Sequence, residues 1–223
     1  MHAPVKVKIC GVTNVADADM AAGLGAWALG MIFYEGSPRR CSLEQAQAIA
    51  ARLRRRVELC GVFVNAPLQE IAGVAEQLGL TLIQLHGEEG PSFCAEVARR
   101  TGARVIKAQQ VSGAGDVRAL ERFHVAFHLL DARANAPALQ DLRGGTGETF
   151  DWSLLRERRS KVPMILSGGL RPQNIAAAIA QTRPYAVDTA SGTEVSPGHK
   201  DPRLLSDFFA AVAEAGAPAA AIG

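Results

Sequence analysis

Short apolar runs alternate with longer amphipathic stretches along the whole chain. Eight of these runs have the length and the two-sided apolar character of buried strands. They begin near Val5, Trp27, Glu58, Thr81, Arg104, Phe127, Pro163 and Tyr185. Several starts are about two dozen residues apart, which is the length that one strand, two short turns and one helix occupy. The pattern therefore predicts stacked βα units and a parallel sheet.

Six stretches between the runs carry apolar residues at helical spacing. They cover residues 16–23, 43–53, 68–78, 92–100, 174–180 and 202–212. Asn14 and Ser42 stand just before two of these stretches, each with Asp or Gln three positions later, as in helix N-terminal caps. Gly79 and Gly102 stand where two helices should end.

Eight βα units exceed the strand number of the usual doubly wound sheet, and no GxGxxG turn follows the first run. We therefore expect an α/β chain that forms a single (β/α)8 barrel over residues 1–223. The segment from residue 215 is rich in Ala, Gly and Pro, and we expect it to be a frayed tail. In such barrels the chemistry lies at the C-terminal ends of the strands.

Composition narrows the class of protein. The 223 residues are 48% hydrophobic and 21% charged, which is enough to bury a full core. The formal charge of +2 gives no basic surface for nucleic acid or for an acidic membrane. No apolar run approaches the roughly 20 residues that span a bilayer, and the four cysteines have no CxxC spacing. We expect a cytoplasmic protein with reduced thiols, either a monomer or a homodimer.

Two reactive side chains end apolar runs. Cys10 closes the first run, and Asp131 closes the sixth. A buried cysteine is more often a small hydrophobe, and an aspartate at this place is often a helix cap. Helix N-termini, however, point toward the catalytic end of a barrel, and we expect their dipoles to lower the thiol pKa from about 8.5. The long stretch after Asp131, residues 132–149, is expected to act as a lid over the site.

Further polar groups follow other strands. The glycine-rich turns at Gly168 and Gly169 and at Ser191 and Gly192 suit a phosphate, helped by a short helix after the eighth strand. Arg39 can grip a carboxylate through two parallel donors, although it could instead be a solvated surface residue.

Two more candidates need weighing. His86 can orient a substrate, and a lone histidine gives no metal site, so we assign no metal. Lys107 could form a Schiff base, but an ion pair inside the barrel is the favoured interpretation.

The motifs at the strand ends resemble, in their order, those of the phosphoribosylanthranilate isomerase family. They are Lys8-Ile9-Cys10-Gly11, Ser37-Pro38-Arg39, Gly61 to Val64, Gln84-Leu85-His86-Gly87, Gly144 to Gly147 with Phe150-Asp151-Trp152, Ser167 to Leu170, and Ser191-Gly192 with Lys200-Asp201. No single tetrapeptide is diagnostic, but the ordered combination is specific and covers nearly the whole chain.

The resemblance implies an enzyme of tryptophan biosynthesis that needs no cofactor. Its reaction is an Amadori rearrangement of N-(5-phosphoribosyl)anthranilate to 1-(2-carboxyphenylamino)-1-deoxyribulose 5-phosphate, an aldose to ketose isomerisation. By the resemblance, Asp131 would be the general acid and Cys10 the general base. Arg39 would hold the anthranilate carboxylate, the two glycine turns would hold the phosphate, and His86 and Asp188 would line the sugar.

Some positions depart from the family pattern. Glu148 follows Gly-Gly-Thr-Gly where a lysine is common, and we expect it to weaken substrate binding somewhat; Arg171 and Thr193 also differ. Two alternatives stay open at this point. One is another sugar-phosphate isomerase or epimerase on the same barrel, and the other is a non-catalytic sensor of a phosphoribosyl ligand, which would place no demand on Cys10 or Asp131.

Overall fold

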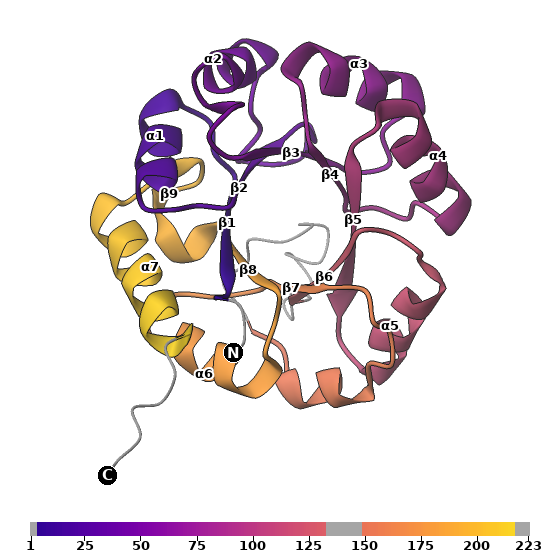
Figure 1. Cartoon of the computed structure of the whole chain (residues 1–223), viewed down its shortest axis with the longest axis vertical. Helices are drawn as coiled ribbons and strands as arrows, with labels where there is room; N and C mark the ends of the chain where they lie inside the picture. The colour runs from indigo at the N-terminus through magenta and orange to yellow at the C-terminus, as the bar shows by residue number, and fades with distance from the viewer. Residues whose placement is uncertain (1–3, 133–148, 217–223) are drawn as a thin grey trace.

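The eight predicted strands close into one barrel (Figure 1). The structure is a computed structural model, and it describes residues 4–132 and 149–216. All strands are parallel, each pairs with the one before it, and β8 pairs with β1. They are β1 (Lys6–Cys10), β2 (Ala28–Ile32), β3 (Glu58–Phe63), β4 (Leu82–Leu85), β5 (Arg104–Val111), β6 (Phe127–Ala132), β7 (Met164–Leu166) and β8 (Ala186–Thr189). Each begins within one residue of its predicted start, which confirms the fold class.

Helices form a ring outside the strands (Figure 1). They are α1 (Val15–Gly23), α2 (Leu43–Leu53), α3 (Leu68–Leu78), α4 (Pro91–Thr101), α5 (Ala114–Ala119), α6 (Ile175–Thr182) and α7 (Pro202–Gly216), with 3₁₀ turns at Leu120–Arg122 and Trp152–Glu157. The sequence did not predict α5. Six residues are too few to show apolar positions at helical spacing, and glycines at positions 113 and 115 flank its first residue. None of the described helices is long and apolar enough to cross a membrane.

Local signals place the helix ends as predicted. The Asn14 side chain accepts a hydrogen bond from the backbone of Asp17, and Ser42 forms a reciprocal capping box with Gln45. Gly79 and Gly102 take the left-handed conformation at the ends of α3 and α4. The helix α7 includes residues 215 and 216, which are the first two residues of the expected tail. Residues 217–223 lie outside the described part.

The barrel interior is closed at the N-terminal ends of the strands. Trp27, Phe127 and Tyr185 stand at the starts of β2, β6 and β8, and their ring centroids are 5.2 to 5.7 Å apart. Lys6 Nζ lies over the rings of Trp27 and Tyr185 and donates to the Tyr185 hydroxyl at 2.9 Å. This aromatic group fills the N-terminal end of the barrel interior, which leaves the C-terminal end of the interior as the place for a ligand among the described residues.

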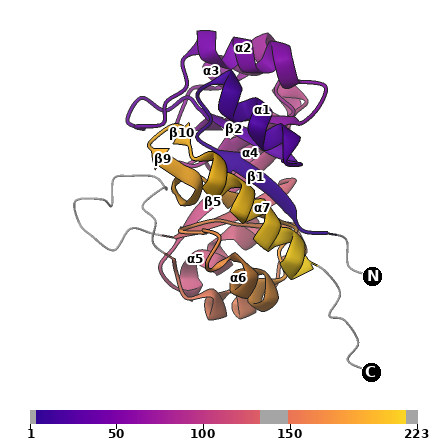
Figure 2. The same ribbon diagram turned by 90° about the vertical axis from the view of Figure 1, so that its left-hand side faces the viewer.

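A two-stranded hairpin follows β8, and the sequence did not predict it. A single 3₁₀ turn, Ser191–Thr193, leads into β9 (Glu194–Ser196), which pairs antiparallel with β10 (His199–Lys200). Strands of two or three residues give no readable alternation. Figure 2 shows β9 and β10 at the end of the barrel opposite the start of β1. The hairpin therefore stands beside the catalytic end.

The helix ring gives a stability prediction at α7. Phe208 is fully buried on the core side of this helix, whereas its neighbour Phe209 is only partly buried. We expect Phe208→Ala to lower the free energy of unfolding by about 3–5 kcal/mol, the range for deleting a buried aromatic ring, because a cavity remains. Phe209→Ala is the matched control and should cost less than half as much. Urea unfolding measures both, and equal losses would contradict this packing.

Candidate active site

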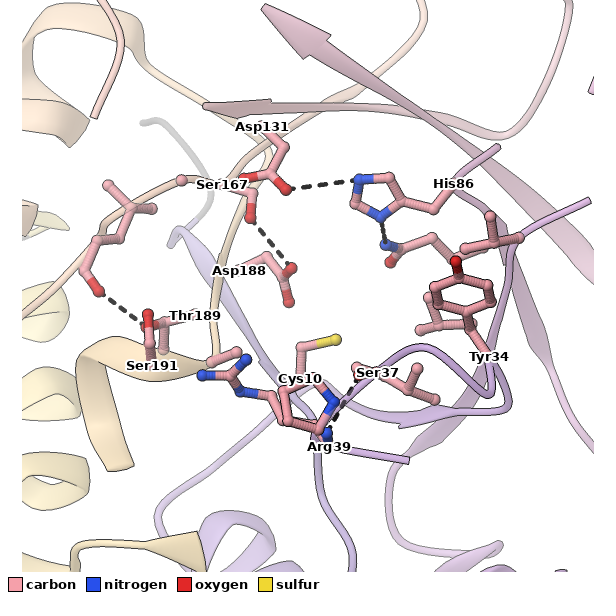
Figure 3. A pocket seen from close by; sticks show the side chains of 18 of the residues that line it. Cys10, Tyr34, Ser37, Arg39, His86, Asp131, Ser167, Asp188, Thr189 and Ser191 are labelled. Atoms are coloured by element: carbon pink, nitrogen blue, oxygen red, sulfur yellow. Dashed lines mark hydrogen bonds and ion pairs between the residues drawn. The ribbon is translucent and has the colours of Figure 1, made fainter. Parts of the chain in front are cut away.

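A pocket of about 770 Å³, including the space open to solvent at its mouth, lies at the C-terminal ends of the strands. Its wall brings together residues from the first, middle and last strands (Figure 3). Eight predicted site residues line it: Cys10, Arg39, His86, Asp131, Gly168, Gly169, Asp188 and Ser191. Gly192 lines an adjoining hollow together with Gly169 and Ser191. The structure thus assembles in one place the residues that the sequence singled out.

Cys10 and Asp131 lie on opposite sides of this pocket, with Asp188 between them (Figure 3). Both are nearly buried, with 6% and 3% of their surface exposed. The other three cysteines are buried elsewhere and do not line the pocket. A ligand in the pocket would therefore meet the thiol of Cys10 on one side and the carboxyl group of Asp131 on the other.

The expectation of a lowered thiol pKa at Cys10 is wrong for the free protein. Burial raises the pKa of Cys10, and Asp188 adds to the increase, while Lys8 and Lys200 oppose it. Helix dipoles alone would lower this pKa, but desolvation in a closed barrel disfavours the thiolate more strongly. Cys10 therefore holds its proton at neutral pH until another charge or a ligand changes its surroundings.

Lys8 is a buried cation that acts on both Asp188 and Cys10, and the sequence did not identify it as a site residue. Its Nζ lies 2.8 Å from Asp188 Oδ1, and the strand register pairs the two residues across β1 and β8. Burial is the largest single effect and lowers the pKa of Lys8, but attraction to Asp188, Cys10 and Cys60 together outweighs it and holds the pKa above its ordinary value. The sequence did contain a signal for this role. Side chains alternate along a strand, so Lys8 lies on the same face as Cys10 and points into the barrel, whereas Val7 and Ile9 face the helices.

The close approach of Lys8 and Cys10 depends on a glycine in the next strand. Gly30 stands beside Cys10 in the register of β1 and β2. A Cβ atom at Gly30 would lie 2.9 Å from Cys10 Sγ and 3.1 Å from Lys8 Nζ, so the thiol and the ammonium share the space that glycine leaves. A hydrogen bond from Lys8 lowers the pKa of Cys10 and so opposes the effect of burial.

Asp131 is an acid whose proton is available near neutrality. Burial raises the pKa of Asp131 to about 7; Asp188 adds to the increase, and hydrogen bonds from the Ala132 backbone and the Ser167 side chain oppose it. Ser167 also lies 3.3 Å from Asp188 through its Oγ, so one hydroxyl contacts both carboxyl groups. A carboxyl group with this pKa can donate a proton at physiological pH.

His86 faces Asp131 from the end of β4. Its Nε2 atom is 3.5 Å from Asp131 Oδ2, and its Nδ1 atom is 3.0 Å from Gln84 Nε2 (Figure 3). The Gln84 amide can only donate through Nε2, so Nδ1 accepts and the ring proton of a neutral His86 sits on Nε2. His86 therefore presents a donor to the side of the pocket that holds the acid.

Arg39 reaches the pocket from the loop after β2 and is 8% exposed. Its Nε donates to Glu194 Oε2 at 2.8 Å and Oε1 at 3.1 Å. Its side-chain hydrogen bonds to described residues are made through Nε, so the two Nη groups are available to a ligand. The structure rules out the solvated-surface alternative for Arg39 and supplies an acidic partner that the sequence did not predict.

The two glycine turns lie side by side, and a hydrogen bond joins the end of β8 to the turn after β7. Thr189 Oγ1, at the end of β8, donates to Leu170 O at 2.8 Å, and Asn174 Nδ2 donates to Gly169 O at 2.9 Å. A Cβ atom at Gly192 would overlap the carbonyl oxygen of Leu170, so only glycine lets the turns approach this closely. The expected helix after β8 is a single 3₁₀ turn that begins at Ser191.

The remaining expectations concern Lys107, a metal site and the segment around Glu148. Lys107 is in an ion pair, as the favoured interpretation predicted: its Nζ is 3.0 Å from Glu89 Oε2, and it does not line the pocket. Among the described residues, no group of three His, Cys, Asp or Glu side chains is arranged to hold a metal ion. Glu148, the Gly-Gly-Thr-Gly motif and most of the expected lid lie outside the described residues.

Comparison with known proteins agrees with this geometry. The family model described as "N-(5'phosphoribosyl)anthranilate (PRA) isomerase" matches residues 7–211. The N-(5'-phosphoribosyl)anthranilate isomerase of Citrifermentans bemidjiense is 47% identical over 205 residues, which are 92% of this chain and 95% of that protein.

Two solved structures extend the agreement to the fold. The phosphoribosyl anthranilate isomerase from Thermus thermophilus superposes with a TM-score of 0.84 at 36% identity, covering 94% of this chain and 99% of that one. A second isomerase, crystallised with reduced 1-(o-carboxyphenylamino)-1-deoxyribulose 5-phosphate, superposes with a TM-score of 0.78 at 39% identity, covering 93% and 98%. The chain belongs to the N-(5'-phosphoribosyl)anthranilate isomerase family.

Proposed function

We propose that this chain catalyses the Amadori rearrangement of N-(5-phosphoribosyl)anthranilate in tryptophan biosynthesis, with Asp131 as general acid and Cys10 as general base. The observation that carries the mechanism is the placement of these two proton-transfer groups on opposite sides of one pocket. The reaction needs a proton delivered to one atom of the sugar and a proton removed from another.

The first step opens the sugar ring. Asp131 donates its proton to the ring oxygen, the bond from C1′ to that oxygen breaks, and the amine nitrogen supplies the electron pair that forms an iminium. The pKa of about 7 suits this step, because a large share of the carboxyl groups is protonated at neutral pH and the resulting carboxylate is still a weak base. The Nε2 proton of His86 lies on the same side and favours the carboxylate that forms.

The second step removes the C2′ proton. Cys10 takes this proton as a thiolate, the electrons move toward the iminium nitrogen, and the resulting enolamine tautomerises to the ketone. Burial keeps the thiolate fraction small, but the iminium acidifies the C2′ proton and Lys8 supplies a positive charge beside the sulfur. Cys10 forms no covalent bond to the substrate in this scheme.

The ends of the substrate would be held by the rest of the pocket. The Nη groups of Arg39 suit the anthranilate carboxylate, and the turns at Gly168, Gly169, Ser191 and Gly192 suit the phosphate. The ligand of the crystallised relative carries both a carboxyphenyl group and a 5-phosphate. A cytoplasmic location and a monomeric or homodimeric state stay predictions from the sequence.

Removal of either proton-transfer group should abolish most of the activity. We expect Cys10→Ala and Asp131→Asn each to lower kcat at least about 100-fold, because a general acid or base typically contributes 100- to 10,000-fold. The loss of substrate fluorescence measures the rate. Both variants should still bind the reduced product analogue, since neither change removes a group that holds the carboxylate or the phosphate.

Two variants outside the pocket control for general damage. Cys41→Ala removes a different buried thiol, and Asp207→Asn removes a surface carboxylate on α7. Both should keep kcat within about threefold of the parent, far from the effect of losing an acid or base. Full activity in Cys10→Ala or Asp131→Asn would sink the mechanism, and a parent protein that binds the analogue without turnover would favour the ligand-sensor alternative.

The raised pKa of Asp131 also predicts a pH-dependent change in stability. Folding raises this pKa from 3.8 to about 7, so the folded protein favours the protonated acid; the stability that the acid contributes is complete below pH 4 and is lost as the pH rises through 7. Asn mimics the neutral acid and does not titrate. Between pH 4 and pH 8, the free energy of unfolding of Asp131→Asn should therefore rise by about 2–4 kcal/mol relative to that of the parent, at about 1.4 kcal/mol per pKa unit.

Urea unfolding of the parent and of Asp131→Asn at several pH values measures this difference. Asp207→Asn is again the control for an aspartate outside the pocket, and its difference from the parent should stay flat over the same range. A constant offset between the parent and Asp131→Asn from pH 4 to pH 8 would show that burial does not raise the pKa of this acid.

A further inference from the structure

Three buried charges lie beside the pocket, and two of them come from the hairpin. Glu194 in β9 accepts from Arg39 Nε, and its Oε1 atom lies 3.0 Å from Lys200 Nζ in β10. The side chains of Glu194 and Lys200 are 4% and 0% exposed. Arg39, Glu194 and Lys200 therefore form one chain of ion pairs that is shielded from water.

Burial lowers the pKa of Lys200, whereas its hydrogen bonds and the charge of Glu194 favour the ammonium form. Its Nζ donates to Cys10 O at 2.7 Å, to Ala190 O at 3.2 Å and to Glu194 Oε1 at 3.0 Å. All three partners are oxygen acceptors, and only the charged group has three protons to donate. The two cations and one carboxylate therefore carry a net formal charge of +1.

The hairpin is itself bound to the loop after β1 and to the first turn of α1. Asp17 Oδ2 accepts from the Lys200 backbone at 2.8 Å, and Thr13 Oγ1 donates to Gly198 O at 2.6 Å. The backbone of Gly198 donates to Glu194 Oε1 at 3.3 Å. These contacts fix the carboxylate of Glu194 in place before any ligand binds.

A fixed Glu194 determines how Arg39 faces the pocket. The guanidinium is planar, so binding of Nε on one edge sets the direction of the two Nη groups. The arginine stem packs closely on Gly11, because its Cδ lies 2.8 Å from where a Cβ of Gly11 would be. An Arg39–Glu194 pair alone would be neutral, and the charge of Lys200 restores one uncompensated positive charge, which matches a single carboxylate.

We propose that Glu194 is a positioning residue that turns the Nη groups of Arg39 toward the substrate carboxylate, with Lys200 as its counter-charge. This inference rests on the proposed function, in which Arg39 binds that carboxylate. The hairpin therefore has a role in substrate specificity. Without Glu194, the enzyme would still hold the phosphate and transfer protons, but it would distinguish poorly between substrates with and without the carboxylate on the aromatic amine.

The test compares two substrates that differ only in the carboxylate. They are the adducts of 5-phosphoribose with anthranilate and with aniline, and the measured quantity is the ratio of their kcat/KM values. We expect Glu194→Gln to lower this preference at least about 10-fold, mainly through KM for the anthranilate adduct, while kcat/KM for the aniline adduct stays within about threefold. Lys200→Met should lower the preference in the same direction.

Two further variants make the outcome decisive. Glu35→Gln is the matched control, because Glu35 pairs with the neighbouring Arg40 at 3.3 Å in the same loop but is exposed; its preference should equal that of the parent. Arg39→Met tests the proposed function: if it keeps the preference, Arg39 does not bind the carboxylate and both proposals fall. If Arg39→Met loses the preference and Glu194→Gln keeps it, only the positioning role is overturned.

A structural role without positioning has its own signature. Equal losses on the two substrates in a folded Glu194→Gln protein would show that the glutamate only supports the fold, and the inference would fall. If Glu194→Gln does not fold, Glu194→Asp takes its place, since it keeps the charge and shortens the reach to Arg39 Nε by one methylene. The same substrate ratio then decides between the two roles.

Discussion

The ion pair between Lys8 and Asp188 is the interaction on which the site depends. It joins the first and the last strand inside the barrel, at 2.8 Å and with almost no exposure, where the register pairs the two residues. Because desolvation of two charges offsets much of their attraction, such a pair adds little net stability over apolar residues of similar size. The ion pair matters for function because it places a positive and a negative charge between the thiol and the acid.

The two halves of this pair act differently on Cys10 and Asp131. Burial raises the pKa of both groups, but among the charges Lys8 has the larger effect on the thiol and Asp188 has the larger effect on the acid. The pair therefore pushes the pKa of the base down and that of the acid up. One buried ion pair thus favours opposite proton-transfer roles for two groups that are both buried.

The sequence predicted what depends on local pattern and missed what depends on register. The starts of the eight strands were predicted to within one residue because each strand is a separate apolar run. Cys10 and Asp131 were found because barrel geometry gives strand ends a special status. Lys8 and Glu194 were not found as site residues, because their roles arise from partners 155 to 180 residues away. The predicted direction of the pKa shift of Cys10 was wrong because desolvation of the thiol depends on how completely the barrel closes.

Long-range contacts also determine when the site exists during folding. The ion pair joins residues 180 apart, and the bond from Lys200 to the Cys10 carbonyl joins residues 190 apart. An intermediate that lacked β8 and the hairpin would keep Cys10, His86 and Asp131 but would lose the counter-charges of Lys8 and Arg39. Burying those two cations without their partners is costly, so we infer that barrel closure and site assembly are one cooperative step. The last βα unit therefore completes the fold and the chemistry together.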